Sequence, residues 1–265
     1  MGLFRRQLPM LISLLLLVVP SFSSAEDAAS AAPLNASEIV QKLMAANLRR
    51  SEALRGYQGK RTYHLTYSGI FGHHQADMQV EMSYTAPDKK EFRVISRSGS
   101  SLLINRILMK MLSSESEAQE EENRKQLEVT SDNYDFALEQ VQHTPQGDFY
   151  VLNVSPKGKS RYLYRGKIWV DARDFAIARM EGEPQKNVSM WASHTEVAYL
   201  WRPQDGFWLP AHTESTSQVR MGGKINLTID YTDYQLNTGT RVANERGVGQ
   251  HEILASPSAV IADPP

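Results

Sequence analysis

The sequence contains no cysteine. This absence excludes disulfide frameworks, thiolate nucleophiles, zinc sites with cysteine ligands and iron–sulfur clusters. It also excludes a lipid-modified N-terminal cysteine, so the chain is not itself a lipoprotein. Whatever stabilises the fold must therefore come from packing, hydrogen bonds and charge.

The chain also has little net charge. It carries 29 Lys and Arg residues against 30 Asp and Glu residues, and its pI is about 6.7. Proteins that bind nucleic acids usually show a basic face or domain, so no nucleic-acid partner is expected. The hydrophobic fraction of 41% and the aromatic fraction of 9% predict a packed core.

The common motifs of catalysis are missing too. There is no Walker A loop, no Rossmann glycine fingerprint and no G-x-S-x-G turn. His73 and His74 could form a metal site with His64 or Asp77, but solvated loop histidines are the favoured interpretation. We therefore predict no enzymatic activity, no cofactor and no metal.

Two charged segments allow a structural and a functional interpretation. Lys157, Lys159, Arg161 and Arg165 surround a turn, where they either steer anionic headgroups or form a solvated hairpin tip, which is the commoner arrangement. The glutamates from Glu115 to Glu122 are more typical of a solvated helix face than of a cation site.

Residues 1–25 have the pattern of a secretory signal peptide. Arg5 and Arg6 supply positive charge, an apolar run covers 8–22, and small residues at 23–25 supply a cleavage site. The run is shorter than the ~20 residues of a membrane-spanning helix, and an uncleaved anchor or a buried helix is the alternative. The pattern predicts export, and a chain without cysteine fits a bacterial periplasm.

Residues 36–54 predict one amphipathic helix, with Asn35 or Ser37 as its N-cap. Beyond it, apolar and polar residues alternate with period two over about ten segments, which is typical of antiparallel strands with one buried face. The residues expected on the buried face are Tyr63, Leu65, Tyr67, Ala76, Met78, Val80, Met82, Tyr84, Tyr150, Leu152, Val154, Tyr162, Tyr164, Ile168, Val170, Trp191, Val197, Tyr199, Trp201, Ile225, Leu227, Ile229 and Tyr231. Residues 26–235 are expected to form one domain, and 236–265 a flexible C-terminal tail.

One segment interrupts the strand pattern. Residues 100–112 are apolar at helical spacing, and a Glu-rich half follows over 113–125. The first half either repacks around a guest molecule or is an ordinary core helix, and the sequence favours neither. The second half is expected to face solvent.

A sheet with one apolar face must be covered or must curl upon itself. The sequence therefore predicts a mainly β, α+β fold, in which a curled antiparallel sheet is closed by helices and encloses an apolar hollow. Sequence parity does not distinguish a filled interior from an empty one. The residues expected to line the hollow are Leu103, Ile107, Leu108, Met78, Val80, Met82, Tyr162, Tyr164, Ile168 and Val170.

Three short motifs carry a family resemblance. Gly166–Ala172 (GKIWVDA), followed by Arg179 and Glu181, resembles the WVD and R-x-E strand pair of the LolA-like superfamily. Gly206–Pro210 (GFWLP) resembles a later strand start in those proteins, and Ile229–Tyr234 resembles their closing strand. The resemblance covers most of 36–235 and implies an unclosed antiparallel β-barrel, or half-barrel, with a helical lid and a cavity for acyl chains.

The same resemblance implies a function in outer-membrane lipoprotein or lipid sorting. The first expectation is a periplasmic carrier of a lipid or of lipoprotein acyl chains, whose partners could include a donor or acceptor protein at the inner or outer membrane. The alternative is an RseB-like module that senses a lipid and acts through a protein partner. A third interpretation is a domain with a filled core and no ligand.

Overall fold

The computed structural model describes residues 33–87, 89–118, 125, 128–160, 162–186 and 192–238. The predicted signal peptide lies outside these residues, as do Arg161, Trp191 and the predicted tail from residue 239 onward. Among the described helices, none combines the length and the apolar character that crossing a membrane requires.

The N-terminal helix α1 (Ala36–Ala53) confirms the helix predicted over 36–54. Its start is fixed by a reciprocal cap, in which Asn35 accepts the Glu38 backbone N–H at 3.0 Å and Glu38 accepts the Asn35 N–H at 2.8 Å. These bonds satisfy donors that a helix start leaves unpaired. The chain then passes directly into the first strand at Leu54.

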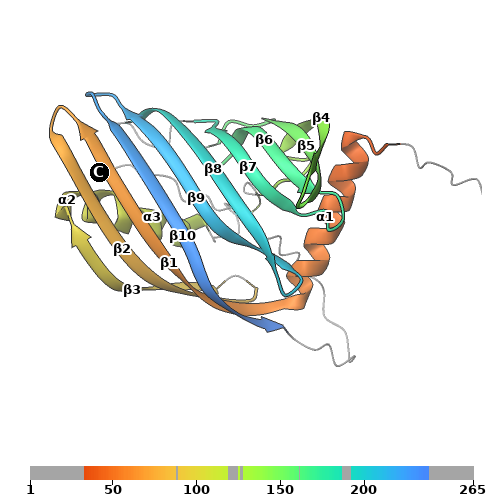
Figure 1. Cartoon of the computed structure of the whole chain (residues 1–265), viewed down its shortest axis with the longest axis horizontal. Helices are drawn as coiled ribbons and strands as arrows, with labels where there is room; N and C mark the ends of the chain where they lie inside the picture. The colour runs from red at the N-terminus through yellow and green to blue at the C-terminus, as the bar shows by residue number, and fades with distance from the viewer. Residues whose placement is uncertain are drawn as a thin grey trace, which may run out of the picture. The chain divides into compact units, whose positions relative to one another are not determined.

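Ten antiparallel strands form one sheet (Figure 1). The strands are β1 (Leu54–Gly69), β2 (Gly72–Thr85), β3 (Lys89–Gly99), β4 (Tyr134–Thr144), β5 (Gly147–Pro156), β6 (Tyr164–Asp171), β7 (Ile177–Pro184), β8 (Ala192–Gln204), β9 (Phe207–Val219) and β10 (Lys224–Thr238). Their order is β3-β2-β1-β10-β9-β8-β7-β6-β5-β4. Since β3 and β4 are both edges, the sheet is not closed into a barrel, as the predicted half-barrel requires.

The last strand is longer than its side-chain pattern. Alternation fades after Tyr234, but β10 continues to Thr238 because its backbone pairs with the start of β1. Thr238 lies opposite Leu54, and Leu236 opposite Tyr57. The strand therefore includes three residues that the sequence pattern assigns to the tail.

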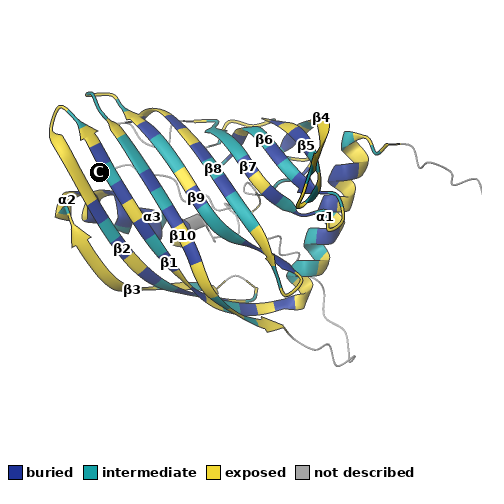
Figure 2. Cartoon of the chain, in the orientation of Figure 1, coloured by how far each residue is buried: buried dark blue, intermediate teal, exposed yellow. Residues whose placement is uncertain are grey.

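One face of the sheet is buried over its central strands, while the edge strands β3 and β4 are largely exposed (Figure 2). The strand registers place Met78, Tyr63, Ile229, Thr213, Tyr199, Met180, Ile168, Leu152 and Leu138 in one row across this inner face. Most residues predicted for the buried face are buried there, while Tyr150, Trp201 and Ile225 are half-buried. Period-two alternation thus identified most of the inner face, with Tyr162, in the turn before β6, as an exception.

The buried face divides into two large apolar clusters. The insertion cluster contains Tyr63, Leu65, Tyr67, Ala76, Met78, Val80, Met82, Leu103, Ile104, Ile107, Leu108, Met111, Leu112, Ala192, Leu227, Ile229 and Tyr231. The α1 cluster contains Ile39, Val40, Leu43, Tyr134, Leu152, Val154, Leu163, Tyr164, Ile168, Val170, Met180, Val197 and Tyr199. A helical segment covers each cluster.

Buried hydroxyl groups lie on the strands between the two clusters. On β9, Thr213 and Ser217 face inward, and Thr195 on β8 lies opposite Ser217. Thr195 and Ser217 share a hydrogen bond of 2.9 Å between their hydroxyls, and the Thr213 hydroxyl lies 3.3 Å from that of Tyr231. These bonds satisfy the buried hydroxyls, and the polar strip interrupts the apolar surface.

The helical insertion follows β3 and consists of α2 (Ser101–Leu103), the π-helix η1 (Ile104–Leu108) and α3 (Met109–Ala118). Ser100 forms the turn before it: its hydroxyl accepts the Leu103 N–H at 3.4 Å, and its own N–H donates to Gln75 O at 2.8 Å. These bonds tie the start of the insertion to β2.

Candidate functional site

The structure brings six of the ten predicted lining residues together. Leu103, Ile107 and Leu108 from the insertion pack with Met78, Val80 and Met82 from β2, all within the insertion cluster. Leu108 and Val80 are fully buried, and Ile107, with 9% exposure, lies nearest the surface. The apolar side of the insertion therefore lies directly on the inner face of β2.

Three more predicted residues lie elsewhere. Tyr164, Ile168 and Val170 belong to the α1 cluster, where Ile39 and Leu43 of the N-terminal helix cover them. The hydroxyls of Tyr164 and Tyr199 lie 3.3 Å apart there. The ten residues thus do not line one surface, because the inner face is covered in two places.

Tyr162 is not on the inner face. It lies in the turn before β6, half-buried, and its backbone N–H donates to the Ser160 hydroxyl at 3.3 Å. The strand begins only at Tyr164, so its alternation does not reach back to residue 162. Leu163 is the turn residue that enters the core, with 4% exposure.

A buried ion pair connects the insertion to the sheet. Arg61 on β1 and Glu115 on α3 are each 4% exposed. The guanidinium donates two hydrogen bonds to the carboxylate, Nη1 to Oε2 at 2.5 Å and Nη2 to Oε1 at 2.9 Å. Such a bidentate pair fixes orientation as well as distance. The pair therefore orients α3 over β1 in this structure.

The surroundings of Arg61 are apolar and aromatic. Its Nε lies 3.0 Å from the Met82 sulfur, and its Cζ lies 5.1 Å from the ring centres of both Phe92 and Tyr231. Lys90 brings a second cation 3.6 Å from the Glu115 carboxylate. Removing either member of the pair would leave a charge in a site with little water.

The expected solvated position of Glu115 is wrong. Its carboxylate faces the sheet because Arg61 occupies an inward position, two residues before Tyr63 on the same strand face. That parity is visible in the sequence, and an arginine in an otherwise apolar row was the available signal. A pattern of apolar residues alone does not detect such a residue.

The pair sets the charge state of Glu115. Burial alone would raise the pKa of this carboxyl, but the attraction and hydrogen bonds of Arg61, with a further contribution from Lys90, lower the pKa to about 2. Burial likewise raises the pKa of the Tyr63 phenol, against the opposing effect of Arg61. At neutral pH the Glu115 carboxyl is therefore negatively charged and the Tyr63 phenol is neutral.

Acid should therefore weaken the fold through Glu115. A folded pKa below the unfolded value stabilises the native state above about pH 4.5, and this contribution is lost as the pH falls to about 2. We expect the wild type to lose about 3 kcal/mol more than Glu115→Gln across this window. Urea unfolding at several pH values measures the difference, and parallel curves for the two proteins would contradict it.

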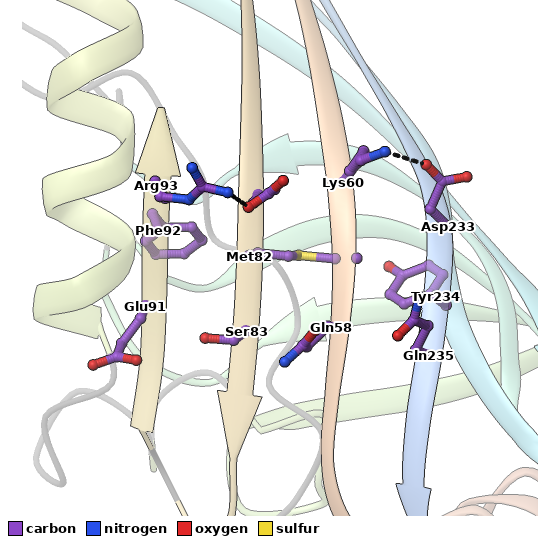
Figure 3. A pocket seen from close by; sticks show the side chains of 12 residues that line it. Gln58, Lys60, Met82, Ser83, Glu91, Phe92, Arg93, Asp233, Tyr234 and Gln235 are labelled. Carbon is purple, nitrogen blue, oxygen red and sulfur yellow. Dashed lines mark hydrogen bonds and ion pairs between the residues drawn. The ribbon is translucent and has the colours of Figure 1, made fainter. Parts of the chain in front are cut away.

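A pocket of about 690 Å³ lies beside this region, over β1, β2, β3 and β10 (Figure 3). Met82 and Phe92 line it together with ion-paired side chains, among them Lys60, which lies 2.9 Å from Asp233. Gly59 is also in its wall, where a Cβ would lie 3.0 Å from the Met82 methyl and 3.1 Å from the Tyr234 ring. The pocket is lined mainly by polar and charged residues, with Met82, Phe92 and Tyr234 as its large apolar or aromatic side chains.

A second groove, of about 500 Å³, crosses β6 to β9. Its walls combine small and apolar residues such as Val197 and Ala198 with charged ones, and His194 lies 3.4 Å from Glu183 and 3.3 Å from Glu196. None of the ten predicted lining residues contributes to this groove. Several of its charged groups are ion-paired, among them Lys167 with Glu139 at 2.8 Å.

The residues considered for a metal site make other contacts. His64 lies 2.7 Å from Asp77, His73 lies 2.9 Å from the Ser68 hydroxyl, and His74 lies 2.9 Å from the Phe71 carbonyl. Among the residues with described positions, no group of three or more His, Asp or Glu side chains could hold a metal ion.

The motifs that carry the family resemblance contact one another. Asp171 accepts the backbone N–H groups of Arg173 at 2.9 Å and Asp174 at 2.8 Å, as a turn carboxylate at a hairpin does. The Trp208 indole N–H then donates to the Asp174 carboxylate at 2.9 Å. The WVD turn and the WLP strand start are thereby joined.

The R-x-E motif makes a local ion pair. Arg179 and Glu181 pair with each other along β7, not across strands. The Arg179 guanidinium also lies 5.0 Å from the Trp169 ring centre on the neighbouring strand. The motif therefore lies on the outer face of the sheet, where an exposed ion pair contributes little to stability.

Comparison with known proteins gives structural similarity alone. No family model matches the chain, and no curated protein matches it. Similar solved structures include a DUF1329 family protein from Desulfovibrio piger (13% identity, 76% of this chain and 95% of that chain, TM-score 0.39). A LolA superfamily protein from Nitrosomonas europaea is 12% identical over 77% and 94% of the two chains, with a TM-score of 0.36. A putative outer membrane lipoprotein-sorting protein domain from Vibrio parahaemolyticus is 13% identical over 78% and 94%, with a TM-score of 0.38. The similar structures thus include the LolA-like group that the sequence motifs resemble.

Proposed function

We propose that this chain is an exported carrier that binds a lipid, or the acyl chains of a lipoprotein, between the inner face of its sheet and its helical insertion. One observation carries the proposal: a separate helical segment covers the apolar face of β1, β2 and β10, where a second sheet layer could have covered it. A cover of this kind can be displaced while the sheet stays intact.

The contacts of the insertion support such a displacement. The strands hydrogen-bond to one another, while the insertion is held mainly by side chains of the insertion cluster and by the pair of Arg61 and Glu115. Segments held by side chains can open locally without global unfolding. The π-helix η1 is a further mark, since such turns occur frequently at functional sites.

The chemistry of the covered surface suits an acyl chain. Burial of each methylene group contributes about 0.8 kcal/mol to binding. A fatty acyl chain that replaces the insertion side chains would therefore cover the apolar sheet face and exclude water from it. Met78, Met82 and Met111 lie in the insertion cluster, and methionine adapts to irregular apolar shapes. In this proposal Arg61, when released from Glu115, offers a cation to an anionic headgroup.

The proposal includes a location and partners but no reaction. Export by the signal peptide would place the protein in the periplasm, where a carrier takes its ligand from one membrane-associated donor and delivers it to an acceptor. Sorting of outer-membrane lipids or lipoproteins is the process that this activity would serve.

Two measurements test the proposal. Lipid extraction and mass spectrometry of the exported protein should recover a lipid in stoichiometric amount. Titration with a fluorescent fatty acid should show saturable binding that an unlabelled fatty acid displaces. If no lipid is recovered and the probe does not bind, the protein is not a carrier of this kind.

A pair of variants locates the binding. Ile107→Asp places a carboxylate under the insertion and should weaken probe binding at least about tenfold. Leu102→Asp is the matched control, since Leu102 is in the same segment but 65% exposed, and its binding should equal that of the wild type. Probe binding of Ile107→Ala is measured as well, because this variant adds no charge. It provides a second test at the same position if Ile107→Asp fails to fold.

A further inference from the structure

Apolar side chains are exposed at the tips of two hairpins. Ile70 and Phe71, in the turn between β1 and β2, are 70% and 63% exposed, and Met221, in the turn between β9 and β10, is 54% exposed. Exposed groups of large apolar residues often mark interaction sites. None of the three contributes to a core cluster of the described chain.

The two tips form one surface. The Tyr67 hydroxyl donates to the Gly222 carbonyl at 3.1 Å, and a Cβ at Gly222 would lie 3.3 Å from the Ile70 Cγ2 atom. Figure 1 shows the two hairpins ending side by side. We call this surface the hairpin rim and define it as Ile70, Phe71, Arg220, Met221 and Lys224.

The charge around the tips is of one sign. Arg220 and Lys224 are both exposed, and neither the stretch 66–76 nor the stretch 215–229 contains an Asp or Glu residue. The next acidic side chain along β2 is Asp77. Its carboxylate oxygen lies 2.7 Å from Nδ1 of His64. The rim therefore combines protruding apolar groups with positive charge that no ion pair within the described part of the chain neutralises.

We propose that the hairpin rim docks the protein on an anionic phospholipid surface. Apolar side chains at protruding tips can enter the headgroup boundary, and flanking Lys and Arg residues are attracted to anionic lipids. Each side of a stable protein interface has about 20–30 residues, whereas the hairpin rim is defined by Ile70, Phe71, Arg220, Met221 and Lys224 alone. A lipid surface accepts a small contact of this kind.

This inference goes beyond carriage of a ligand and does not require it. The start of the insertion lies at the same end of the sheet, because Ser100 bonds to Gln75 only a few residues from the β1–β2 turn. Docking through the rim would therefore bring the insertion close to the membrane. Vesicle binding and probe binding can fail separately, so the two proposals are tested independently.

The test is co-sedimentation with vesicles, on wild type and variants prepared identically. The wild type should bind vesicles of phosphatidylglycerol and phosphatidylethanolamine more strongly than vesicles of phosphatidylcholine, and high salt should weaken the binding. Ile70→Ser with Phe71→Ser, and separately Arg220→Glu with Lys224→Glu, should each lower the partition coefficient at least about tenfold. Val141→Ser is the matched control, an apolar residue 40% exposed on β4.

The outcomes are distinct. Loss of vesicle binding in both rim variants, with unchanged fatty-acid probe binding and unchanged circular dichroism, supports docking by the rim. Wild-type binding in either rim variant, a comparable loss in Val141→Ser, or failure of the wild type to bind either kind of vesicle would overturn the proposal. If the wild type sediments with vesicles but binds no probe, the carrier function is wrong and the docking surface stands.

Discussion

Replacing Glu115 with leucine will lower the free energy of unfolding by about 3–5 kcal/mol, because it leaves the Arg61 guanidinium buried without its partner. Both side chains are 4% exposed, and two hydrogen bonds are lost together with the charge. Urea unfolding monitored by circular dichroism measures the change. We expect the urea concentration at the unfolding midpoint to fall. The dependence of the unfolding free energy on urea should stay similar, since the surface buried by the sheet is unchanged.

A double variant separates the charge from the packing. Arg61→Met with Glu115→Leu should recover most of the lost stability, since paired removal of buried charges is often neutral. Lys89→Met provides an exposed comparison: Lys89 lies 2.8 Å from Glu91, but both side chains are more than 60% exposed. Its effect should stay below about 1 kcal/mol. A double variant as unstable as Glu115→Leu would show that the pair does not determine the effect.

Replacing Leu108 with alanine will cost about 2–5 kcal/mol, because this side chain is fully buried between the insertion and the inner face of the sheet. The cost combines lost burial with the cavity left behind. Thermal or urea unfolding gives the change in stability, and a fluorescent fatty acid shows whether the new space accepts a longer chain.

Leu102 provides the control in the same insertion. It is 65% exposed, so Leu102→Ala should change stability by no more than about 0.5 kcal/mol. A small change in stability for both Leu108→Ala and Leu102→Ala would mean that the insertion contributes little to the stability of the native state. A large effect at Leu102 would contradict the described position of α2.

The sheet was predictable because its two faces differ in solvent exposure. Antiparallel strands with one wet face alternate at every residue, and this pattern identified Met78 and Tyr63 on β2 and β1 as well as Ile168 on β6. The N-terminal helix was predictable for a related reason, since Asn35 provides a cap and an apolar stripe follows. These signals are local in the chain.

The site was less predictable because its contacts are between distant segments. Arg61 and Glu115 are 54 positions apart and neither is apolar, so no local pattern joins them. The division into two clusters depends on the hydroxyls of Thr213 and Ser217, which belong to the polar half of any sequence pattern. Tyr162 has the residue type of an inner-face position but precedes the strand. Tertiary pairing decides each of these cases.

A photoreactive fatty acid tests the central claim most directly. After illumination of the purified exported protein with a diazirine fatty acid, digestion and mass spectrometry identify the labelled peptides. We expect saturable labelling, removed by excess unlabelled fatty acid, within residues 76–84 of β2 and 101–112 of the insertion. Labelling that does not saturate, or that falls only on peptides outside the insertion cluster, would contradict the account.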